Sequence, residues 1–293
     1  MKNDVTAHTG VPYEGDYIQY QQAGWSYSYG TEGKVVNKNL VTYISCTFNG
    51  YYSTAEDEKQ MNVRVKELIG SFGFTLLTSK YEKIKVIHDW ICGNVSYDYD
   101  HLNDETYLRK HSAAAALLDG TAVCQGFALL FYRLCLECGV DARYISGDAG
   151  GGPHGWNIAD PGDGRYYYVD TTWDEPYFED GWEDEYHYTY FLKGSRTFAA
   201  DHKPNDGFIE SLGEGYDVSE EDFDPSVLKV IGDVNGDNKV DYIDLTILAR
   251  YLAGWDKYKN LPDTADVSGD GTVTAIDRMI LARYLKEYAA FAK

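Results

Sequence analysis

The stretch that decides the fold is GTAVCQGFALLFYRL (residues 120–134), which predicts a turn and then a helix over 124–138 that ends at Gly139. Its apolar residues recur at helical spacing and predict a core-facing stripe: Phe127, Leu130, Phe131 and Leu134. Cys124 stands at the start of this helix, where the helix dipole and free backbone N–H groups stabilise a thiolate. The pattern therefore predicts a buried helix with a reactive cysteine in its first turn.

Three strand patterns follow this helix. VDARYISG (140–147) precedes the Gly-rich loop DAGGGP, and then HGWNIAD (154–160) and RYYYVDTTW (165–173) flank the turn PGDG. We expect the last two strands to form a hairpin in an even register whose paired residue numbers sum to 324. His154 then lies directly opposite Asp170 on one face, whereas an odd register would separate them.

Cys124, His154 and Asp170 together supply what thiol catalysis needs. A thiolate requires a neighbouring base, and the base requires a carboxylate that fixes its tautomer. Each residue alone would more often be an ordinary loop or surface group, but the combination favours a catalytic site. The other four cysteines lie within strand or helix patterns, where a small buried residue is the default. The Cys135/Cys138 pair offers at most two metal ligands, so packing is favoured over zinc.

These motifs resemble the transglutaminase-like superfamily, which has a papain-type fold. The resemblance covers residues 79–203 and rests on GTAVCQGFALLFYRL, HGWNI and YYYVDTTWD, with IHDWICGNVSYD upstream and YFLKGSRTFAADH downstream. It implies an α+β catalytic domain without a cofactor, in which a helix with an N-terminal cysteine packs on an antiparallel sheet. It also implies Cys124 as nucleophile and oxyanion-binding N–H donor, His154 as base and acid, and Asp170 as the residue that orients it. Tyr97 and His111 are the candidates for a second oxyanion donor.

The last sixty residues contain an internal repeat. DVNGDNKVDYIDLTILARYL (233–252) aligns with DVSGDGTVTAIDRMILARYL (266–285), and 13 of the 20 positions are identical. Each copy reads as an acidic loop followed by a helix with one buried face. Loop positions 1, 3, 5, 7, 9 and 12 have the spacing of calcium ligands, position 7 acting through its backbone carbonyl. The expected ligands are Asp233, Asn235, Asp237, Lys239, Asp241 and Asp244 in the first loop, and Asp266, Ser268, Asp270, Thr272, Thr274 and Asp277 in the second.

This duplicated unit, over 231–293, resembles the dockerin module of cellulosomal proteins. The resemblance implies a small all-α module with two calcium-binding loop-helix repeats, hence two Ca²⁺, and docking to a cohesin domain of a scaffoldin. By the family pattern, the cohesin contacts fall on Tyr242, Ile243, Arg250, Ala275, Ile276 and Arg283. Because the two copies are nearly symmetric, either face could bind.

The remaining chain completes a domain plan. Patterns predict a strand over 41–52 and helices over 54–72, 79–95 and 106–120, the second beginning with a Ser79–Glu82 capping box. We expect an accessory or pro-segment-like region at 1–78, the catalytic domain at 79–212, an acidic linker at 213–230 and the dockerin at 231–293. The opening segment MKNDVTAHTG has no apolar core, so no signal peptide is expected in this sequence.

Charge excludes some classes of partner. The 293 residues include 47 acidic and 26 basic side chains, a net charge of -21. Such a surface repels phosphates and anionic lipids, and no apolar stretch is long enough to span a bilayer, so neither nucleic acid nor membrane is expected. Most of the surplus belongs to residues 1–230, with a net charge of -19. The acidic stretch DEPYFEDGWEDEYHY (174–188) could rim the cleft and favour basic substrates, or be a solvated loop.

Taken together, the sequence predicts a secreted, cellulosome-attached thiol enzyme that cleaves amide bonds of a protein or peptide. Cross-linking by a transglutaminase is the alternative within the same chemistry. A second alternative is a non-catalytic binding module that uses the 27 tyrosines as a surface for plant-wall polymer. A glycoside hydrolase is disfavoured, because no pair of catalytic carboxylates stands out among 47 acids.

Overall fold

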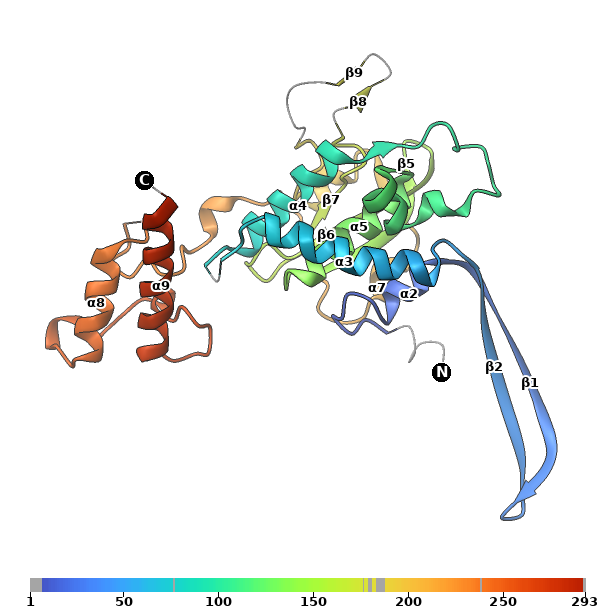
Figure 1. Cartoon of the computed structure of the whole chain (residues 1–293), viewed down its shortest axis with the longest axis horizontal. Helices are drawn as coiled ribbons and strands as arrows, with labels where there is room; N and C mark the ends of the chain where they lie inside the picture. The colour runs from blue at the N-terminus through green and yellow to red at the C-terminus, as the bar shows by residue number, and fades with distance from the viewer. Residues whose placement is uncertain are drawn as a thin grey trace. The chain divides into compact units, whose positions relative to one another are not determined.

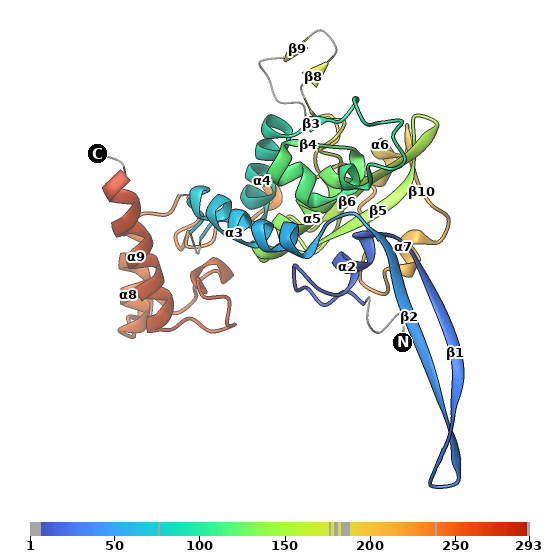
Figure 2. The same ribbon diagram turned by 45° about the vertical axis from the view of Figure 1, so that its right-hand side comes forward.

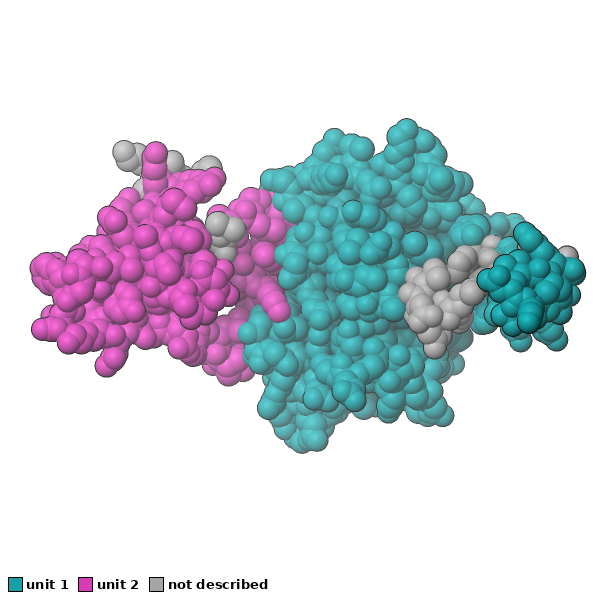
Figure 3. Space-filling model, turned by 90° about the horizontal axis from the view of Figure 1, so that it is seen from below, with its two compact units in different colours: residues 1–71, 84–223 teal, residues 72–83, 224–293 magenta. Residues whose placement is uncertain are grey.

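The computed structural model describes residues 7–75, 77–175, 177–178, 181–182, 188–237 and 239–291. The chain forms two compact units, coloured separately in Figure 3: unit 1 comprises Met1–Ser71 and Ile84–Phe223, and unit 2 comprises Phe72–Lys83 and Asp224–Lys293. No helix within the described residues has the length and apolarity to cross a bilayer.

Unit 1 is organised around a four-stranded antiparallel sheet in the order β10-β5-β6-β7 (Figures 1 and 2). Its strands are β5 (Ala142–Ala149), β6 (Gly152–Ala159), β7 (Tyr167–Val169) and β10 (His202–Pro204). Helix α5 (Cys124–Glu137) packs on β5 and β6, and its predicted core stripe is fully buried. The predicted α+β architecture, with a helix that begins at a cysteine on an antiparallel sheet, is therefore confirmed.

The Gly-rich segment 148–153 is a tight turn within a hairpin rather than the expected loop. Ala149 pairs with Gly152, and the two residues between them, Gly150 and Gly151, have φ values of 60° and 88°. Positive φ at both central residues gives the turn a twist that matches the flanking strands, and only glycine adopts it without strain. β5 and β6 therefore run to the turn itself, and His154 lies within β6 rather than at its start.

The register of β6 and β7 is even, as expected, but the paired numbers sum to 326 instead of 324. Ala159 pairs with Tyr167 and Asn157 with Val169, so Asp170 lies just beyond the ladder, diagonal to His154. The connection is longer than the PGDG turn because Asp160 Oδ1 accepts hydrogen bonds from the N–H groups of Gly162 and Gly164. A diagonal pair on one face is still within reach of long side chains.

Four further helical segments belong to this part of the chain. α3 (Ala55–Ser71) and α4 (Lys80–Asn94) match their predicted helices, and Ser79 and Glu82 exchange backbone-to-side-chain hydrogen bonds as a capping box. The helix expected over 106–120 is broken into a 3-10 turn, η1 (Leu108–His111), and a π-helix, η2 (Ala115–Asp119). Ser112 causes the break, because its hydroxyl accepts from Ala115 N–H and donates to Arg109 O.

An N-terminal hairpin, called the arm below, projects away from the rest of unit 1 in both views (Figures 1 and 2). It consists of β1 (Gln22–Val36) and β2 (Asn39–Tyr51), joined by Asn37 and Lys38 with φ values of 51° and 66°. The pattern over 41–52 predicts only the second strand. The arm's first strand has few branched apolar residues, so its pattern is weak.

The shorter elements of unit 1 connect these parts. They are α2 (Asp16–Tyr20), β3 (Ser96–Tyr97), β4 (Thr121–Ala122), β8 (Tyr177–Phe178), β9 (Gly181–Trp182), α6 (Ser195–Phe198) and α7 (Phe208–Ser211). The region before residue 79 contributes Tyr17, Met61, Val65 and Leu68 to the buried residues of unit 1. Side chains 176–187 of the acidic stretch 174–188 lie outside the described residues.

Part of the segment expected as a linker is paired with unit 1. Ser219 N–H donates to Tyr166 O at 2.9 Å, and Gly194 N–H donates to Asp222 Oδ1 at 2.9 Å. Unit 2 resumes at Asp224 and contains η3 (Pro225–Val227), α8 (Tyr242–Leu252), η4 (Asp256–Tyr258), η5 (Asp263–Ala265) and α9 (Ala275–Phe291). Its buried core includes Val234, Leu248, Ala265, Val267, Leu281 and Leu285, drawn from both sequence copies.

Candidate active site

Cys124, the expected nucleophile, is the first residue of α5, as the sequence predicts. Its thiol is free and half-buried. The helix can begin here because Gly126 has no side chain: a Cβ at that position would lie 2.6 Å from Ala122 Cβ and 2.8 Å from Ser112 O. The backbone around the cysteine is therefore packed closely on β4 and η1, which fixes where the sulfur lies.

His154 and Asp170 form a direct contact from neighbouring parts of the sheet. His154 Nε2 lies 2.6 Å from Asp170 Oδ2, which leaves Nδ1 as the ring nitrogen that can serve Cys124. Burial alone would lower the pKa of His154, but the charge and hydrogen bond of Asp170, with a hydrogen bond to Cys124, raise it to about 10. At neutral pH the imidazole is therefore predominantly protonated, and it stabilises an adjacent thiolate.

Asp170 is 1% exposed and accepts four hydrogen bonds. Oδ1 accepts from the backbone N–H groups of Thr172 and Trp173, and Oδ2 faces the ring nitrogens of His154 and His202. Burial would raise the pKa of this carboxyl, but the charges and hydrogen bonds of the two histidines hold it well below its usual range. The carboxylate thus stays ionised and fixed in orientation.

His202 is a site residue that the sequence analysis missed. It lies in the edge strand β10, is buried, and places Nε2 3.1 Å from Asp170 Oδ2 while Nδ1 lies 2.6 Å from Asp201 Oδ1. His154, Asp170 and His202 each bring one ligand atom within 4.8 Å of the others, and are the one such group of three among the described residues. One signal in the sequence could have found His202. The motif YFLKGSRTFAADH ends in Asp201–His202, and histidine is scarce in this chain, which has only seven.

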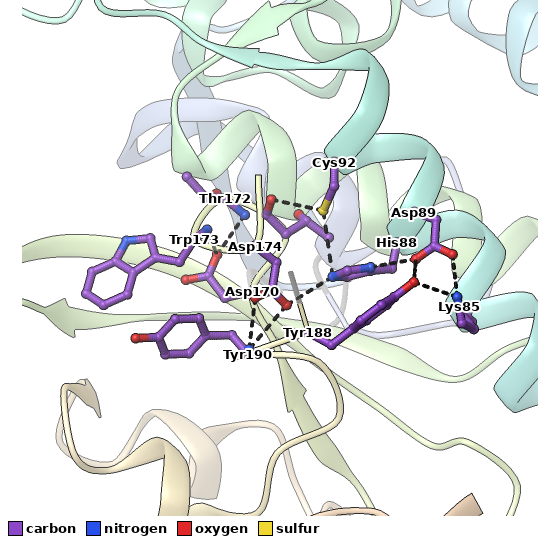
Figure 4. A network of polar contacts seen from close by, with 11 residues as sticks. Lys85, His88, Asp89, Cys92, Asp170, Thr172, Trp173, Asp174, Tyr188 and Tyr190 are labelled. Atoms are coloured by element: carbon purple, nitrogen blue, oxygen red, sulfur yellow. Dashed lines mark hydrogen bonds and ion pairs between the residues drawn. The ribbon is translucent and has the colours of Figure 1, made fainter. Parts of the chain in front are cut away.

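A second polar network adjoins Asp170 through Asp174 (Figure 4). His88, buried in α4, places Nε2 3.1 Å from Asp174 Oδ2 and Nδ1 3.1 Å from Asp89 Oδ1. Asp174 is tied to the turn that carries Asp170, because its N–H donates to Asp170 O at 3.2 Å. Burial would lower the pKa of His88, but the neighbouring Cys92 and two carboxylates raise it well above its ordinary value. A buried charged cluster therefore fixes the turn that carries Asp170 to α4.

The two candidates for a second oxyanion donor have different surroundings. Tyr97 lies in β3, where burial and then the charges of Cys124 and Asp170 are among the causes that raise the pKa of its hydroxyl. The ring of His111 lies 5.2 Å from that of Tyr52, and burial together with Lys110 lowers its pKa. Tyr97 is therefore the candidate whose surroundings include the cysteine.

The two acidic loops of unit 2 have matching hydrogen bonds. In each, the first aspartate accepts backbone N–H groups from within its loop: Asp233 Oδ1 from Gly236, and Asp266 Oδ1 from Gly269. The twelfth residue, Asp244 or Asp277, is buried and accepts N–H groups near both ends of its loop. Gly271, at position 6 of the second loop, has a positive φ of 86°, and its counterpart Asn238 lies outside the described residues.

This donor set fits a hard cation, because the expected ligand atoms are all oxygens. No three acids of either loop bring ligand atoms within 4.8 Å of one another within the described part of the chain. Like charges repel, and here the carboxylates accept backbone N–H groups instead. The remaining expected ligands are exposed or half-buried around the same loops: Asn235, Asp237, Lys239, Asp241, Ser268, Asp270, Thr272 and Thr274.

The expected cohesin contacts lie at corresponding places of the two copies but differ in their neighbours. Tyr242, Ile243, Ala275 and Ile276 are exposed at the first turns of α8 and α9. Arg250 donates to Tyr258 Oη and stacks over Trp255, whereas Arg283 donates to Glu287. Beside Arg250 is a hollow of about 360 Å³ whose lining includes Tyr242 and Trp255. The sequence symmetry therefore does not extend to the surroundings of the two arginines.

Comparison with protein families covers both regions. Residues 74–184 match the transglutaminase-like superfamily, and residues 231–286 match the Dockerin type I domain. The chain carries a transglutaminase-like core and a C-terminal dockerin. Dockerin type I domains bind calcium, and a dockerin implies a cohesin partner and a place in an extracellular cellulosome. The two matches together support a cellulosome-associated, enzyme-like protein.

Individual relatives are distant. The Kyphoscoliosis peptidase of Mus musculus is 27% identical over 142 residues, which are 43% of this chain and 21% of the mouse protein. The chain thus matches about a fifth of that relative's length. A crystal structure of a TGase covers 53% of this chain and 47% of its own, with 21% identity and a TM-score of 0.37. A candidate cysteine protease from Cytophaga hutchinsonii has 17% identity, coverages of 52% and 66%, and a TM-score of 0.27.

Proposed function

We propose that the protein is a thiol hydrolase of amide bonds in proteins or peptides, anchored to a scaffoldin by its dockerin. Catalysis is assigned to residues within 79–212 and docking to residues 231–293. The observation that carries the proposal is the 2.6 Å contact between His154 Nε2 and Asp170 Oδ2, with a further hydrogen bond from His154 to Cys124 at the start of α5. This is the order of contacts that thiol catalysis requires.

The proposed reaction has two halves. Cys124 Sγ, having given its proton to His154, attacks the amide carbonyl carbon, and the backbone N–H of Cys124 stabilises the oxyanion. His154 then protonates the leaving amine as the C–N bond breaks, which leaves a thioester on Cys124. Water then attacks the thioester while His154 removes a proton from the water. The carboxylic acid product is released, and His154 returns the proton to the sulfur of Cys124.

Asp170 and His202 act through His154 in this scheme. Asp170 holds the ring by Nε2 and balances the positive charge of the imidazolium. His202 holds the same carboxylate oxygen, and Asp201 holds His202. These contacts support a ring whose position changes little between the two proton transfers.

A peptide-library incubation tests the chemistry and separates hydrolysis from cross-linking. Wild type, Cys124→Ala and the control Cys138→Ala, at the other end of α5, are incubated with and without a primary amine donor. New amino termini that require Cys124 support the hydrolase. Amine incorporation that requires Cys124 would indicate a transglutaminase instead. Identical products from wild type and Cys124→Ala would contradict the enzyme and favour the non-catalytic binding module.

The docking half has its own test. Binding to a cohesin panel is measured with calcium, after chelation, and after calcium is restored. We expect binding only with calcium, and loss of metal binding when Asp244 and Asp277 are both changed to asparagine. Variants Ile243→Asp and Ile276→Asp, singly and together, report which face binds. Calcium-independent binding would contradict the assigned ligands.

A further inference from the structure

The arm carries an exposed apolar row on one face. Trp25, Tyr27 and Tyr29 occupy alternate positions of β1 and are 39%, 66% and 82% exposed, and Ile44 pairs with Tyr29 on β2. Alternate residues of a strand share a face. The rings of Trp25 and Tyr27 lie 5.8 Å apart at 28°. None of the described side chains of β1 and β2 is buried, and most of the surface of Tyr27 and Tyr29 is open to solvent.

The opposite face of the arm is mostly small and polar. Ser26 and Ser28 pair with Thr47 and Ser45, and all four are exposed, while Tyr43, opposite Gly30, adds one aromatic ring there. A two-stranded ribbon is marginally stable on its own in water. A two-stranded ribbon has an outer edge on each strand, and with a row of exposed rings on one face it offers a surface that another chain can complete.

Charge separates the arm from the rest of the chain. Residues 22–51 contain only three charged side chains, Glu32, Lys34 and Lys38, and carry a net charge of +1. The remainder of the chain carries -22. A second copy brought to the arm would add another strongly acidic body, whereas a neutral or basic polypeptide would meet no such repulsion.

Both ends of the arm are fastened beside the expected nucleophile. Gln125, which follows Cys124, donates from Nε2 to Tyr20 O at 3.0 Å, just before β1. The same side chain hydrogen-bonds the hydroxyl of Tyr52, just after β2. The ladder closes where Tyr52 N–H donates to Gln21 O at 3.0 Å. A segment aligned along the arm can therefore lead toward the start of α5.

We propose that the arm docks the polypeptide that the active site attacks; this inference rests on the proposed function. An extended, uncharged or basic segment of the substrate adds to an open edge of the arm through main-chain hydrogen bonds. Its apolar side chains cover Trp25, Tyr27 and Tyr29. Backbone edges recognise amide groups at strand spacing, so they favour a polypeptide over a sugar polymer. The arm thus selects unfolded protein segments over short peptides.

The experiment uses the full chain with calcium and separates binding from turnover. In the Cys124→Ala background, affinity for fluorescently labelled, reduced and carboxamidomethylated lysozyme, an unfolded basic chain, is measured by anisotropy. Tyr27→Ser with Tyr29→Ser removes the two most exposed rings of the row, and Ser26→Ala with Ser28→Ala on the other face is the matched control. We expect the first pair to weaken binding of the unfolded lysozyme at least tenfold and the second to leave it within twofold.

In the active chain, the tyrosine pair should raise KM for the unfolded lysozyme about tenfold and leave kcat/KM for a six-residue peptide and the alkylation rate of Cys124 unchanged. Equal binding of the unfolded lysozyme by both pairs overturns the inference while the hydrolase stands. Arm-dependent binding of the unfolded lysozyme without any Cys124-dependent product overturns the hydrolase instead. Tyrosine-dependent dimerisation or binding to insoluble cellulose, with no binding of the unfolded lysozyme, also overturns the inference.

Discussion

Two Cys–His–Asp sets lie in unit 1, and they are built differently. In the first, the two nitrogens of His154 face different partners, Asp170 at Nε2 and Cys124 at the other. In the second, His88 Nε2 faces both Cys92 at 3.6 Å and Asp174 at 3.1 Å, while Nδ1 faces Asp89. The second imidazole is held between two carboxylates and has no nitrogen left to move a proton for its cysteine.

The two cysteines also differ in position. Cys92 is fully buried within α4, its thiol donates to Thr171 O, and burial raises its pKa. Cys124 begins a helix and is partly exposed. Residue types alone therefore do not distinguish the expected nucleophile from a structural cluster. The distinction lies in a cysteine at a helix terminus and in an imidazole whose two nitrogens face different partners.

The largest expected effect separates the two thiols. Cys124→Ala should abolish fast alkylation by iodoacetamide and lower turnover by about a thousandfold or more, because the nucleophile is gone. Cys92→Ala should leave the alkylation rate within twofold and cost mainly stability. Mass spectrometry of the alkylated site makes the assignment. Fast labelling at Cys92 would break the comparison.

The two aspartates should separate activity from stability. Asp170→Asn should lower kcat by roughly a thousandfold or more, since the ring loses its carboxylate partner. Asp174→Asn should instead lower the free energy of unfolding by about 3 kcal/mol, because it leaves His88 with one carboxylate in a buried site. Kinetics and urea unfolding of both variants are the measurements. A catalytic loss at Asp174 as large as that at Asp170 would refute the division.

His202 should adjust the pKa of His154 in the first set without being essential for turnover. His202→Gln removes one of the interactions that lower the pKa of Asp170, so the still ionised carboxylate becomes a stronger partner for the imidazolium. The alkaline limb of kcat/KM, expected near the His154 pKa of about 10, should move to higher pH because His154 keeps its proton longer. We expect about a tenfold loss of kcat with little change in KM. His101→Gln, at an exposed position, serves as control, and an unmoved limb would contradict the role.

The smallest effect concerns Glu175, which is buried beside Tyr97. Burial raises its pKa to about 8 from 4.5, against the opposing hydrogen bond of Tyr97 N–H. A raised pKa means that stability is full below pH 4.5 and falls as pH rises toward 8, because the unfolded chain ionises first. Glu175→Gln should flatten that fall and raise Tm by several degrees at pH 8 and less at pH 5. Parallel melting curves would exclude a buried proton here.

The candidate calcium loops, whose residues are close in sequence, could be predicted more fully than the candidate active site, whose residues come from distant parts of the chain. Each acidic loop of the dockerin has its expected ligands within twelve residues, so spacing alone predicts them. Cys124, His154 and Asp170 could be grouped because a hairpin and a helix terminus follow from pattern. His202 could not, since it reaches Asp170 only through β10, whose pairing with β5 depends on the whole sheet. The register error has a similar origin: the loop length depends on Asp160 accepting two backbone N–H groups.

The shared oxygen of Asp170 has a practical consequence. Two imidazole nitrogens and a carboxylate oxygen within 4.8 Å, close to a thiol, form the donor set that Zn²⁺ prefers. Trace zinc is therefore expected to inhibit at the site, while the all-oxygen loops of the same chain are expected to take calcium. A general chelator would remove inhibitory zinc from the candidate active site and would also remove calcium from the acidic loops. The buffer in which this chain is both docked and active must discriminate between the two metals.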